Sequence, residues 1–405
     1  MSTAVDLATW DFASPEFQND PYPVYAALRD QGPVTRIERP EFTSDWVTHY
    51  ETVATVLRDE RFFAVQVPED MMAPGVPEAF RRLGELLSHM MLLENPPDHT
   101  RLRGLVNKAF TPRVVENLRP RIETIVAELI AAVHRNGRAD VMPDLATPLP
   151  VAVIAELMGV PVTDLDRFKE WSDAIAVVLD GSIRGAGLPA AAQAGGELAD
   201  YLRDLVRKRR VSPRDDLLSR LVQARERDDA LSEQELIATA ILILLAGHET
   251  TTNLIGNGVL ALADHPAEWQ KLCMEPECVP GAVEEVLRWD GPVQLTTRGV
   301  REPVELAGWR FEPGIEVNLS LAAAGRDSRQ FPGAERFDVL RNPNRHLAFG
   351  HGGHFCLGAP LARLEAQVLF RALAERMPAF KVERAGVQRR PGLVLRGLQS
   401  LPIDF

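Results

Sequence analysis

Residues 349–358 read FGHGGHFCLG, which places four glycines, two histidines and one cysteine in ten positions. Glycines allow the backbone to lie close to another group. Two kinds of site fit this pattern. Cys356 and the histidines could be ligands of a small zinc site, or the loop could lie against a large flat group that only the sulfur reaches. Cys356 precedes a predicted helix with Pro360 near its first turn, and that position favours the thiolate.

A second unusual segment interrupts the most apolar stretch of the chain. After AILILLAG, residues 240–247, the chain continues with His248, Glu249 and Thr250. Polar and β-branched residues lower helix propensity, and a buried glutamate costs free energy unless it is paired or hydrated. The segment is either an exposed turn of a surface helix or an acid–alcohol pair at a reaction centre. A zinc-protease motif is excluded, because it needs a second histidine where this chain has Thr252.

Several basic groups are spread along the chain. His99 and Arg103 are four residues apart and share one face of a predicted helix. Arg298 lies in a β-like segment, and His354 stands two residues before Cys356. Each of them is ordinary by itself. Together they could supply several donors to a dianionic ligand.

Glu285 and Arg288 are three residues apart on a predicted helix, close enough to touch. Arg336 lies in a later irregular segment, 326–348. These charges are either a solvated ion pair or a structural network that holds the irregular segment beneath the cysteine loop.

Helical patterns dominate the chain. We expect helices at 22–29, 51–58, 99–110, 118–135, 148–158, 164–180, a segment ending near 210, 232–263, 279–289 and 359–377. The longest, 232–263, starts with the capping-box pattern of Ser232 and Glu235 and would be about 48 Å long. We expect β-like segments at 46–49, 293–300, 304–306 and 316–319.

This distribution predicts a mainly α fold, with one large helical domain over residues 1–405 and a minor β-rich part. The stretch 67–97 is irregular, with room for one internal helix. Residues 181–196 carry three glycines in their first seven positions, which indicates a flexible lid connection within the domain.

Composition excludes several classes of protein. The net charge of −12 argues against nonspecific nucleic-acid binding. Three cysteines do not form a disulfide framework and fit a reducing cytoplasm. The N-terminus lacks a signal-peptide pattern, and the most apolar stretch is far shorter than the roughly 20 residues that span a bilayer. We therefore expect a soluble, cytoplasmic protein.

The motifs, taken together, resemble those of the cytochrome P450 family. FGHGGHFCLG fits the family's cysteine-loop pattern F-G-x-G-x-H-x-C-x-G without mismatch. AGHET (246–250) resembles its oxygen-activating helix motif, EVLR (285–288) its ExxR motif, and HTRLR (99–103) its haem-propionate helix. The motifs occur in the family's order and spacing, and the resemblance covers nearly the whole chain. It is closest to the soluble bacterial members of secondary-metabolite pathways.

The resemblance implies haem b as the cofactor, with Cys356 as its axial ligand and Phe349 on the proximal side. Glycines that would allow close approach to the porphyrin and the sulfur are Gly350, Gly352, Gly353 and Gly358. Groups that would hold the two propionates are His99, Arg103, Arg298 and His354. Glu285, Arg288 and Arg336 would form a fold-stabilising triad.

On the opposite side of the haem, the resemblance implies that Ala246 and Gly247 leave room for O2. Glu249 and Thr250 would relay protons. The implied activity is that of a haem-thiolate monooxygenase, which inserts one atom of O2 into an organic substrate by hydroxylation or epoxidation. A peroxide-driven haem-thiolate enzyme and a non-catalytic haem sensor are alternatives, and the acid–alcohol pair speaks against both. The zinc interpretation lacks a convincing fourth ligand.

Electrons would come indirectly from NAD(P)H through a separate ferredoxin and its reductase. Basic residues on or near the expected proximal helices could form the docking surface, or be ordinary solvated charges: Arg101, Lys108, Arg113 and Arg363. The substrate is expected to be a mostly hydrophobic small molecule, either free or tethered to a carrier. Pocket candidates are Met91, Leu92, Ile243, Ala246, Val293, Leu295 and Leu395.

Overall fold

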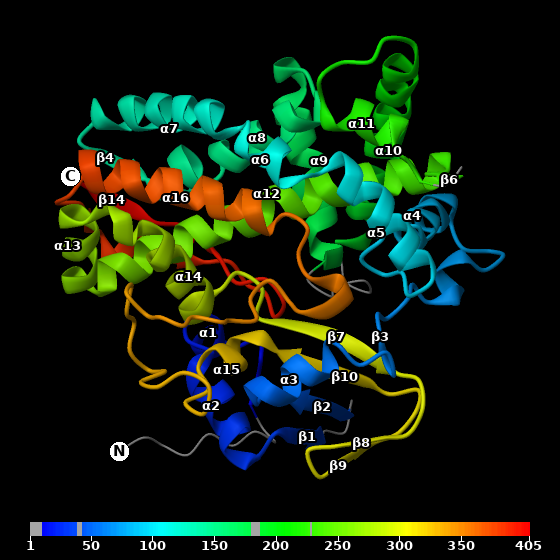
Figure 1. Cartoon of the computed structure of the whole chain (residues 1–405), viewed down its shortest axis with the longest axis horizontal. Coiled ribbons are helices and arrows are strands. Elements are labelled where there is room, and N and C mark those ends of the chain that lie inside the picture. The colour runs from blue at the N-terminus through cyan, green and yellow to red at the C-terminus, as the bar shows by residue number, and fades with distance from the viewer. Residues whose placement is uncertain (1–9, 39–42, 180–186, 227–228) are drawn as a thin grey trace.

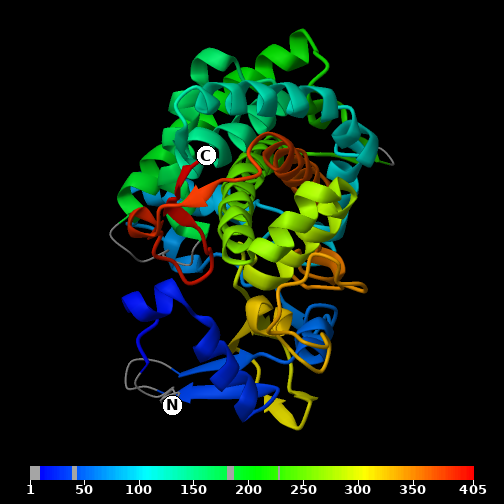
Figure 2. The same cartoon turned by 90° about the vertical axis from the view of Figure 1, so that its left-hand side faces the viewer.

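The computed structural model describes residues 10–38, 43–179, 187–226 and 229–405. The fold is mainly α-helical with a small β part, as the sequence predicted. Figures 1 and 2 show most of the helices gathered in one half of the molecule and the largest sheet in the other, together with α1 (Pro15–Asn19), α2 (Tyr22–Gln31), α3 (Tyr50–Val56) and α15 (Leu321–Gly325). Within the described residues, no helix is both long and apolar enough to cross a membrane.

The helices expected from periodicity are present, together with additional ones. The helices of the described residues are α1 (Pro15–Asn19), α2 (Tyr22–Gln31), α3 (Tyr50–Val56), α4 (Glu78–Ser88), α5 (Asp98–Ala109), α6 (Pro112–Glu116), α7 (Arg119–His134), α8 (Pro148–Met158), α9 (Leu165–Leu179), α10 (Leu188–Val211), α11 (Leu217–Gln223), α12 (Glu233–Asp264), α13 (Pro266–Met274), α14 (Val279–Asp290), α15 (Leu321–Gly325) and α16 (Ala359–Arg376). Of these, α1, α6, α11, α13 and α15 are additional helices that were not predicted.

The long helix α12 is the centre of the helical half (Figure 1). Ser232 caps it and Glu235 completes the predicted capping box. Helices α8, α10, α14 and α16 pack against it. A helix enclosed on several sides must be apolar around its circumference, which explains why almost every residue from Leu236 to Leu262 is buried. The exceptions lie near its middle and matter for the site.

The strands are short and form several small sheets. They are β1 (Val34–Glu38), β2 (Thr43–Val47), β3 (Phe62–Phe63), β4 (Arg138–Asp140), β5 (Arg225–Glu226), β6 (Asp229–Ala230), β7 (Leu295–Val300), β8 (Val304–Leu306), β9 (Trp309–Phe311), β10 (Glu316–Ser320), β11 (Lys381–Val382), β12 (Gln388–Arg389), β13 (Leu398–Ser400) and β14 (Pro402–Asp404). The main sheet has the order β1-β2-β10-β7-β3, in which only β2 and β10 pair in parallel.

Some expectations need correction. The expected strand 46–49 is the end of β2, which starts at Thr43. The predicted connection 181–196 is too long, because α10 starts at Leu188 and residues 188–196 therefore belong to the helix. The first part of that connection, up to residue 186, lies outside the described residues. Several short strands, such as β1 and β11, were missed because so short a segment shows little periodicity.

The triad expected from the ExxR motif exists with a different third member. Glu285 accepts hydrogen bonds from Arg288 at 2.7 and 2.8 Å, and the paired side chains are fully buried. The second cation is Arg341, whose Nε lies 3.1 Å from Glu285 Oε2. The Arg336 side chain is 75% exposed and pairs with Asp338. Arg336 contributes only its backbone carbonyl, which accepts from Arg288 and Arg341.

Candidate functional site

Cys356 stands between a tight loop and the N-terminus of α16. Its backbone N–H donates to the carbonyl of Phe349 at 2.9 Å, which closes the loop. The residue is exposed. Desolvation by the surrounding protein raises the pKa of the thiol, whereas the N–H groups of Gly358 and Ala359 and the nearby Arg103 act in the opposite direction. The loop therefore presents a sulfur that already has hydrogen-bond donors for its anionic form.

Two glycines of the loop are required by its backbone. Gly350 and Gly352 have φ of +71° and +72°, a region that residues with a side chain rarely adopt. A Cβ at Gly352 would also lie 2.6 Å from the carbonyl oxygen of Leu57. Gly353 and Gly358 have room for a Cβ within the protein. Their lack of a side chain is therefore needed only if another group lies against the loop. Phe349 is half-buried beneath the loop, with the Arg363 guanidinium 4.5 Å from its ring.

The four predicted basic residues come together from three segments: α5 carries His99 and Arg103, β7 carries Arg298, and the cysteine loop carries His354. The rings of His99 and His354 stack with their centroids 3.9 Å apart. Arg103 donates to the carbonyl of Phe355 at 2.6 Å, and Arg298 is buried on β7. Burial and the neighbouring histidine and arginines lower the pKa of His354 to about 3. Burial lowers the pKa of Arg298 to about 10.

These four groups have no carboxylate partner in the part of the chain that the structure describes. The buried Nε2 of His99 also lacks a hydrogen-bond partner there. Burying like charges together without an anion is costly. A ligand with two carboxylates would remove this cost, so the residues present fit the two propionates of a haem.

The chemistry of the cysteine also excludes the zinc alternative. Within the described residues, only Asp173, His248 and Glu249 form a group of three or more acidic, histidine or cysteine residues close enough to share an ion. Cys356 is not among them, so it lacks the further ligands that a zinc site needs.

The middle of α12 opens on one face only. Ile243, Ala246, Gly247 and Thr250 are exposed or half-buried, whereas their neighbours along the helix are buried. Their spacing of three and four residues places them on a single stripe. The helix therefore presents a narrow accessible surface inside an otherwise closed helical half. Gly247 has an additional reason to be small, since a Cβ would lie 2.8 Å from Ile154 of α8.

The acid–alcohol pair lies at the end of this stripe. The Thr250 hydroxyl donates to the carbonyl of Ala246 at 2.9 Å. Glu249 is buried and forms an ion pair with Arg390. Asn253 donates to the same carboxylate oxygen at 3.4 Å. Nothing in the sequence predicted that Arg390 would contact Glu249, because Arg390 lies 141 residues later and belongs to no motif.

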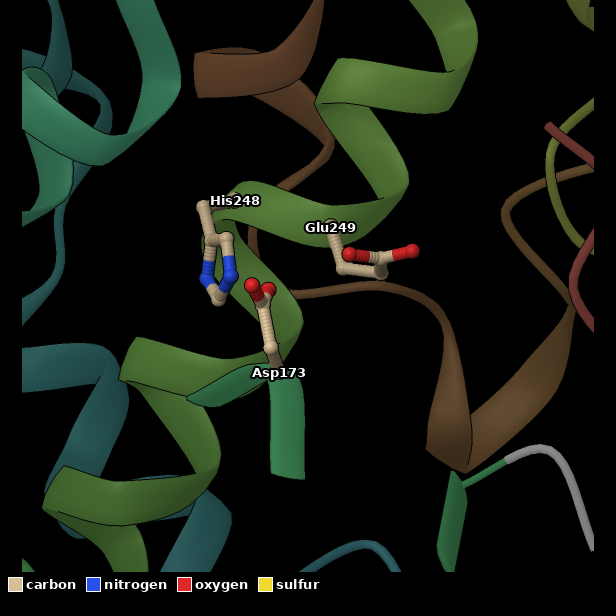
Figure 3. Close-up of side chains that lie close together, drawn as sticks. All are labelled: Asp173, His248 and Glu249. Carbon is tan, nitrogen blue, oxygen red and sulfur yellow. The ribbon is translucent and has the colours of Figure 1, made fainter. Parts of the chain in front are cut away.

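A second acid reaches this segment from another helix. Asp173 of α9 lies beside His248 and Glu249, and one ligand atom from each of the three lies within 4.8 Å of the others. Figure 3 shows the Asp173 carboxylate next to the His248 ring, while the Glu249 side chain extends away from that ring. Sequence reasoning missed Asp173, which looks like any acidic residue on an amphipathic helix.

Comparison with known proteins identifies the family. A family model described as cytochrome P450 matches residues 188–391. The chain is 44% identical over 398 residues to the cytochrome P450 monooxygenase PikC of Streptomyces venezuelae, covering 96% of this chain and 92% of that protein. The chain belongs to the cytochrome P450 family. This P450 is also 39% identical over 401 residues to the polyketide biosynthesis cytochrome P450 PksS of Bacillus subtilis, covering 96% of this chain and 97% of that protein.

Solved structures agree with this assignment. The complex of P450BioI with an acyl carrier protein that bears hexadec-9Z-enoic acid has a TM-score of 0.90 and 38% identity, covering 97% of this P450 and 100% of that chain. The prediction of a haem-thiolate monooxygenase is therefore confirmed at the level of the family.

The pocket residues predicted for this P450 are only partly accessible. Ile243 and Ala246 face the open stripe of α12. Val293 and Leu395 form a β-bridge and are half-buried. Leu92 is 45% exposed, while Met91 is buried in the helical core. Leu295 is buried in a cluster with Tyr25 and Trp46, so the structure does not support it as a pocket residue.

The predicted basic surface needs a similar correction. Arg101 pairs with Glu235 and Asp229, and Arg363 makes two hydrogen bonds with Glu284, at 2.7 and 2.8 Å. Both are therefore largely neutralised within the chain. Arg113 is exposed at the start of α6, and Lys108 lies in the last turn of α5.

Proposed function

We propose that this P450 inserts one atom of O2 into a mostly hydrophobic small organic molecule, with Cys356 as the ligand of haem b. A haem with a cysteine thiolate ligand supplies the oxygen activation, in which O–O cleavage is favoured by electron donation from sulfur. The observation that carries this proposal is the convergence of an exposed cysteine at a helix N-terminus with four basic groups that have no described anionic partner.

Cys356 is suited to hold the iron because backbone N–H groups already face its sulfur. Replacing Cys356 by Ser should abolish the red-shifted Soret band of the reduced carbonyl complex. Cys273→Ser is the matched control, since Cys273 is a half-buried cysteine on another helix. Retention of the band in the Cys356 variant would show that another residue is the ligand.

The haem carboxylates would be bound by Arg103, Arg298, His99 and His354. Arg103 lies on α5 and Arg298 on β7, so the two cations would hold the cofactor's carboxylates from two different elements. The buried Nε2 of His99 would gain the hydrogen bond that it lacks in the described protein.

On α12, Ala246 would leave space above the iron, and Thr250 and Glu249 would supply protons. The Thr250 hydroxyl is accessible and donates to the Ala246 carbonyl, so its oxygen can accept a hydrogen bond from a water. Glu249, which forms an ion pair with Arg390, can accept a proton and pass it toward Thr250.

Thr250→Ala should keep haem and substrate binding but lower product formation per NAD(P)H consumed, with release of peroxide. Positioned proton transfer is worth about 10²–10⁴-fold in rate, so the loss of coupling should be large. Thr250→Ser, which retains the hydroxyl, should restore most of the coupling. Coupling equal to that of the parent enzyme in the alanine variant would rule out the relay and favour a peroxide-driven reaction.

Electrons would reach this P450 from NAD(P)H through a ferredoxin reductase and a ferredoxin. After the correction of Arg101 and Arg363, the docking surface would centre on the exposed Arg113. Arg113→Glu should raise the ferredoxin concentration needed for half-maximal turnover and leave substrate binding unchanged.

The substrate class is supported by the accessible apolar residues and by the names of relatives. PksS is named for polyketide biosynthesis, and a relative 43% identical over 386 residues is the mycinamicin IV hydroxylase/epoxidase of Micromonospora griseorubida. We therefore propose hydroxylation or epoxidation of a mostly hydrophobic molecule. Spectral titration with free acids, macrolactones and their carrier-bound thioesters would separate free from tethered substrates, as bound substrate displaces water from the iron.

A further inference from the structure

His248 is a buried histidine whose ring has one satisfied and one unsatisfied nitrogen. It is 2% exposed, and its Nδ1 lies 2.9 Å from the carbonyl oxygen of Leu244. Because a carbonyl only accepts, Nδ1 must carry the hydrogen. In the neutral ring, Nε2 is then an acceptor with its lone pair available. No described group donates to it.

The acidic groups that lie close to the His248 ring are also acceptors. The Asp173 carboxylate lies beside the ring (Figure 3), and oxygens of Asp173 and Glu249 belong to the same cluster within 4.8 Å. Each carboxylate has a cation of its own, since Lys169 lies 2.6 Å from Asp173 and Arg390 pairs with Glu249. Several acceptors that face one another are stable only when a donor lies between them.

Two kinds of donor could lie there, a water or a metal ion. Two groups that each hydrogen-bond one water at about 2.8 Å are about 4.6 Å apart at a tetrahedral angle. Two ligands of one zinc ion are only about 3.4 Å apart, because each metal bond is about 2.1 Å long. The His248 Nε2 has no hydrogen-bond partner within direct reach, and both carboxylates are already paired. The limit of 4.8 Å leaves room for a bridging water, and the carboxylates, each of which already has a cation, do not require a further one.

We propose that Asp173, His248 and Glu249, bridged by water, form the solvent end of the proton route to Thr250. This inference rests on the proposed relay through Glu249 and Thr250, and extends it to a named entrance. The Asp173 side chain is 44% exposed, whereas the Glu249 side chain is 6% exposed. Asp173 thus connects bulk water to a buried acid that has no such access of its own.

The route conserves protons. A proton from solvent binds Asp173 and passes through the bridging water to Nε2 of His248, which becomes a donor on both nitrogens. His248 then releases the Nε2 proton to Glu249, which passes it toward Thr250. The next proton from solvent restores each group, so no residue changes its protonation over a turnover. Asp173 and His248 do not touch substrate or haem in this scheme and are positioning residues.

The test compares Asp173→Asn and His248→Gln with Asp166→Asn, which removes an exposed carboxylate from the same helix α9. Because water can bypass an entrance more easily than it can replace the final donor, we expect a loss of coupling of about tenfold, smaller than for Thr250→Ala. The solvent deuterium isotope effect on turnover should increase in Asp173→Asn and His248→Gln. Asp166→Asn should behave like the parent enzyme.

A measurement independent of turnover uses ¹⁵N-histidine NMR of the diamagnetic reduced carbonyl form. The signals that disappear in His248→Gln identify the two ring nitrogens of His248. In the parent protein, these signals should show a hydrogen on Nδ1 and an Nε2 that accepts a hydrogen bond. Asp173→Asn should shift the Nε2 signal. A ring protonated only at Nε2 would overturn the proposal. One zinc ion bound per chain, and lost in His248→Gln, would equally overturn it in favour of a metal site.

The outcomes also separate this inference from the relay on which it rests. If Thr250→Ala uncouples turnover while Asp173→Asn and His248→Gln do not, the relay stands and the entrance is wrong. If Thr250→Ala leaves coupling unchanged, the relay itself fails.

Discussion

Two buried arginine clusters in this P450 have opposite electrostatic balance. In the triad cluster, Arg288 and Arg341 surround Glu285, and carbonyl groups take up the remaining guanidinium hydrogens. In the loop cluster, Arg103 and Arg298 lie near two histidines and have no carboxylate in the described chain. The first cluster is complete within the protein. The second is complete only with an anion from outside.

The balance of charge distinguishes the triad cluster, which is a structural site, from the loop cluster, which is a binding site. Both clusters contain cations that are mostly desolvated, and desolvation penalises a cation in either place. The triad cluster meets that cost with its own glutamate, so it stabilises the fold without a ligand. The loop cluster leaves the cost unmet, which favours a dianionic cofactor and places it next to Cys356.

The largest effect is expected from breaking the triad cluster. Arg341→Ala leaves the fully buried Glu285 with one cation fewer, and loss of a partner from a buried ion pair costs about 3–5 kcal/mol. Denaturant unfolding of the haem-loaded protein, followed by circular dichroism, measures the change in the free energy of unfolding.

Arg336→Ala is the matched control for this prediction. Its exposed side chain pairs only with Asp338, and the carbonyl that it gives to the triad cluster is retained. The change should lie within about 0.5 kcal/mol. Equal destabilisation by the two substitutions would restore Arg336 as the third member of the triad.

A smaller effect is expected from the loop cluster. Arg103→Ala and Arg298→Ala should each speed haem release by about tenfold, since a hydrogen bond to a charged group contributes about 1.5–3 kcal/mol. The double variant should release haem faster than either single variant. Transfer of haem to a haem-free globin measures the rate, with Arg113→Ala as an exposed-arginine control. Unchanged release from the double variant would contradict the propionate assignment.

The smallest effect is a pH dependence of the haem-free protein. The folded-state pKa of His354 is lowered to about 3, against about 6.5 in an unfolded chain. Between these values the unfolded chain binds more protons, so stability falls as pH decreases from 6.5 toward 3. Thermal unfolding at pH 7.5 and pH 5 should show a smaller loss for His354→Gln than for the parent protein. An equal loss would mean that His354 is not neutral in the folded chain.

The sequence determined the elements and the motifs that carry chemistry. The period of apolar residues predicted α12 and α16 nearly to the residue, because a helix buried on several sides has a strong pattern. The glycines and Cys356 indicated a loop pressed against a flat group, because few residues tolerate such a backbone. The connection before α10 was predicted too long, because the pattern of its glycine-rich stretch is weak.

Only the tertiary structure decided which charges meet. Arg341, rather than Arg336, reaches Glu285, because the chain between residues 336 and 341 turns and exposes the earlier side chain. Arg390 and Asp173 reach the acid and histidine of α12 from distant segments, and no local spacing encodes these contacts. Sequence patterns follow the periods of helices and strands, whereas the pairing of buried charges depends on how those elements pack in space.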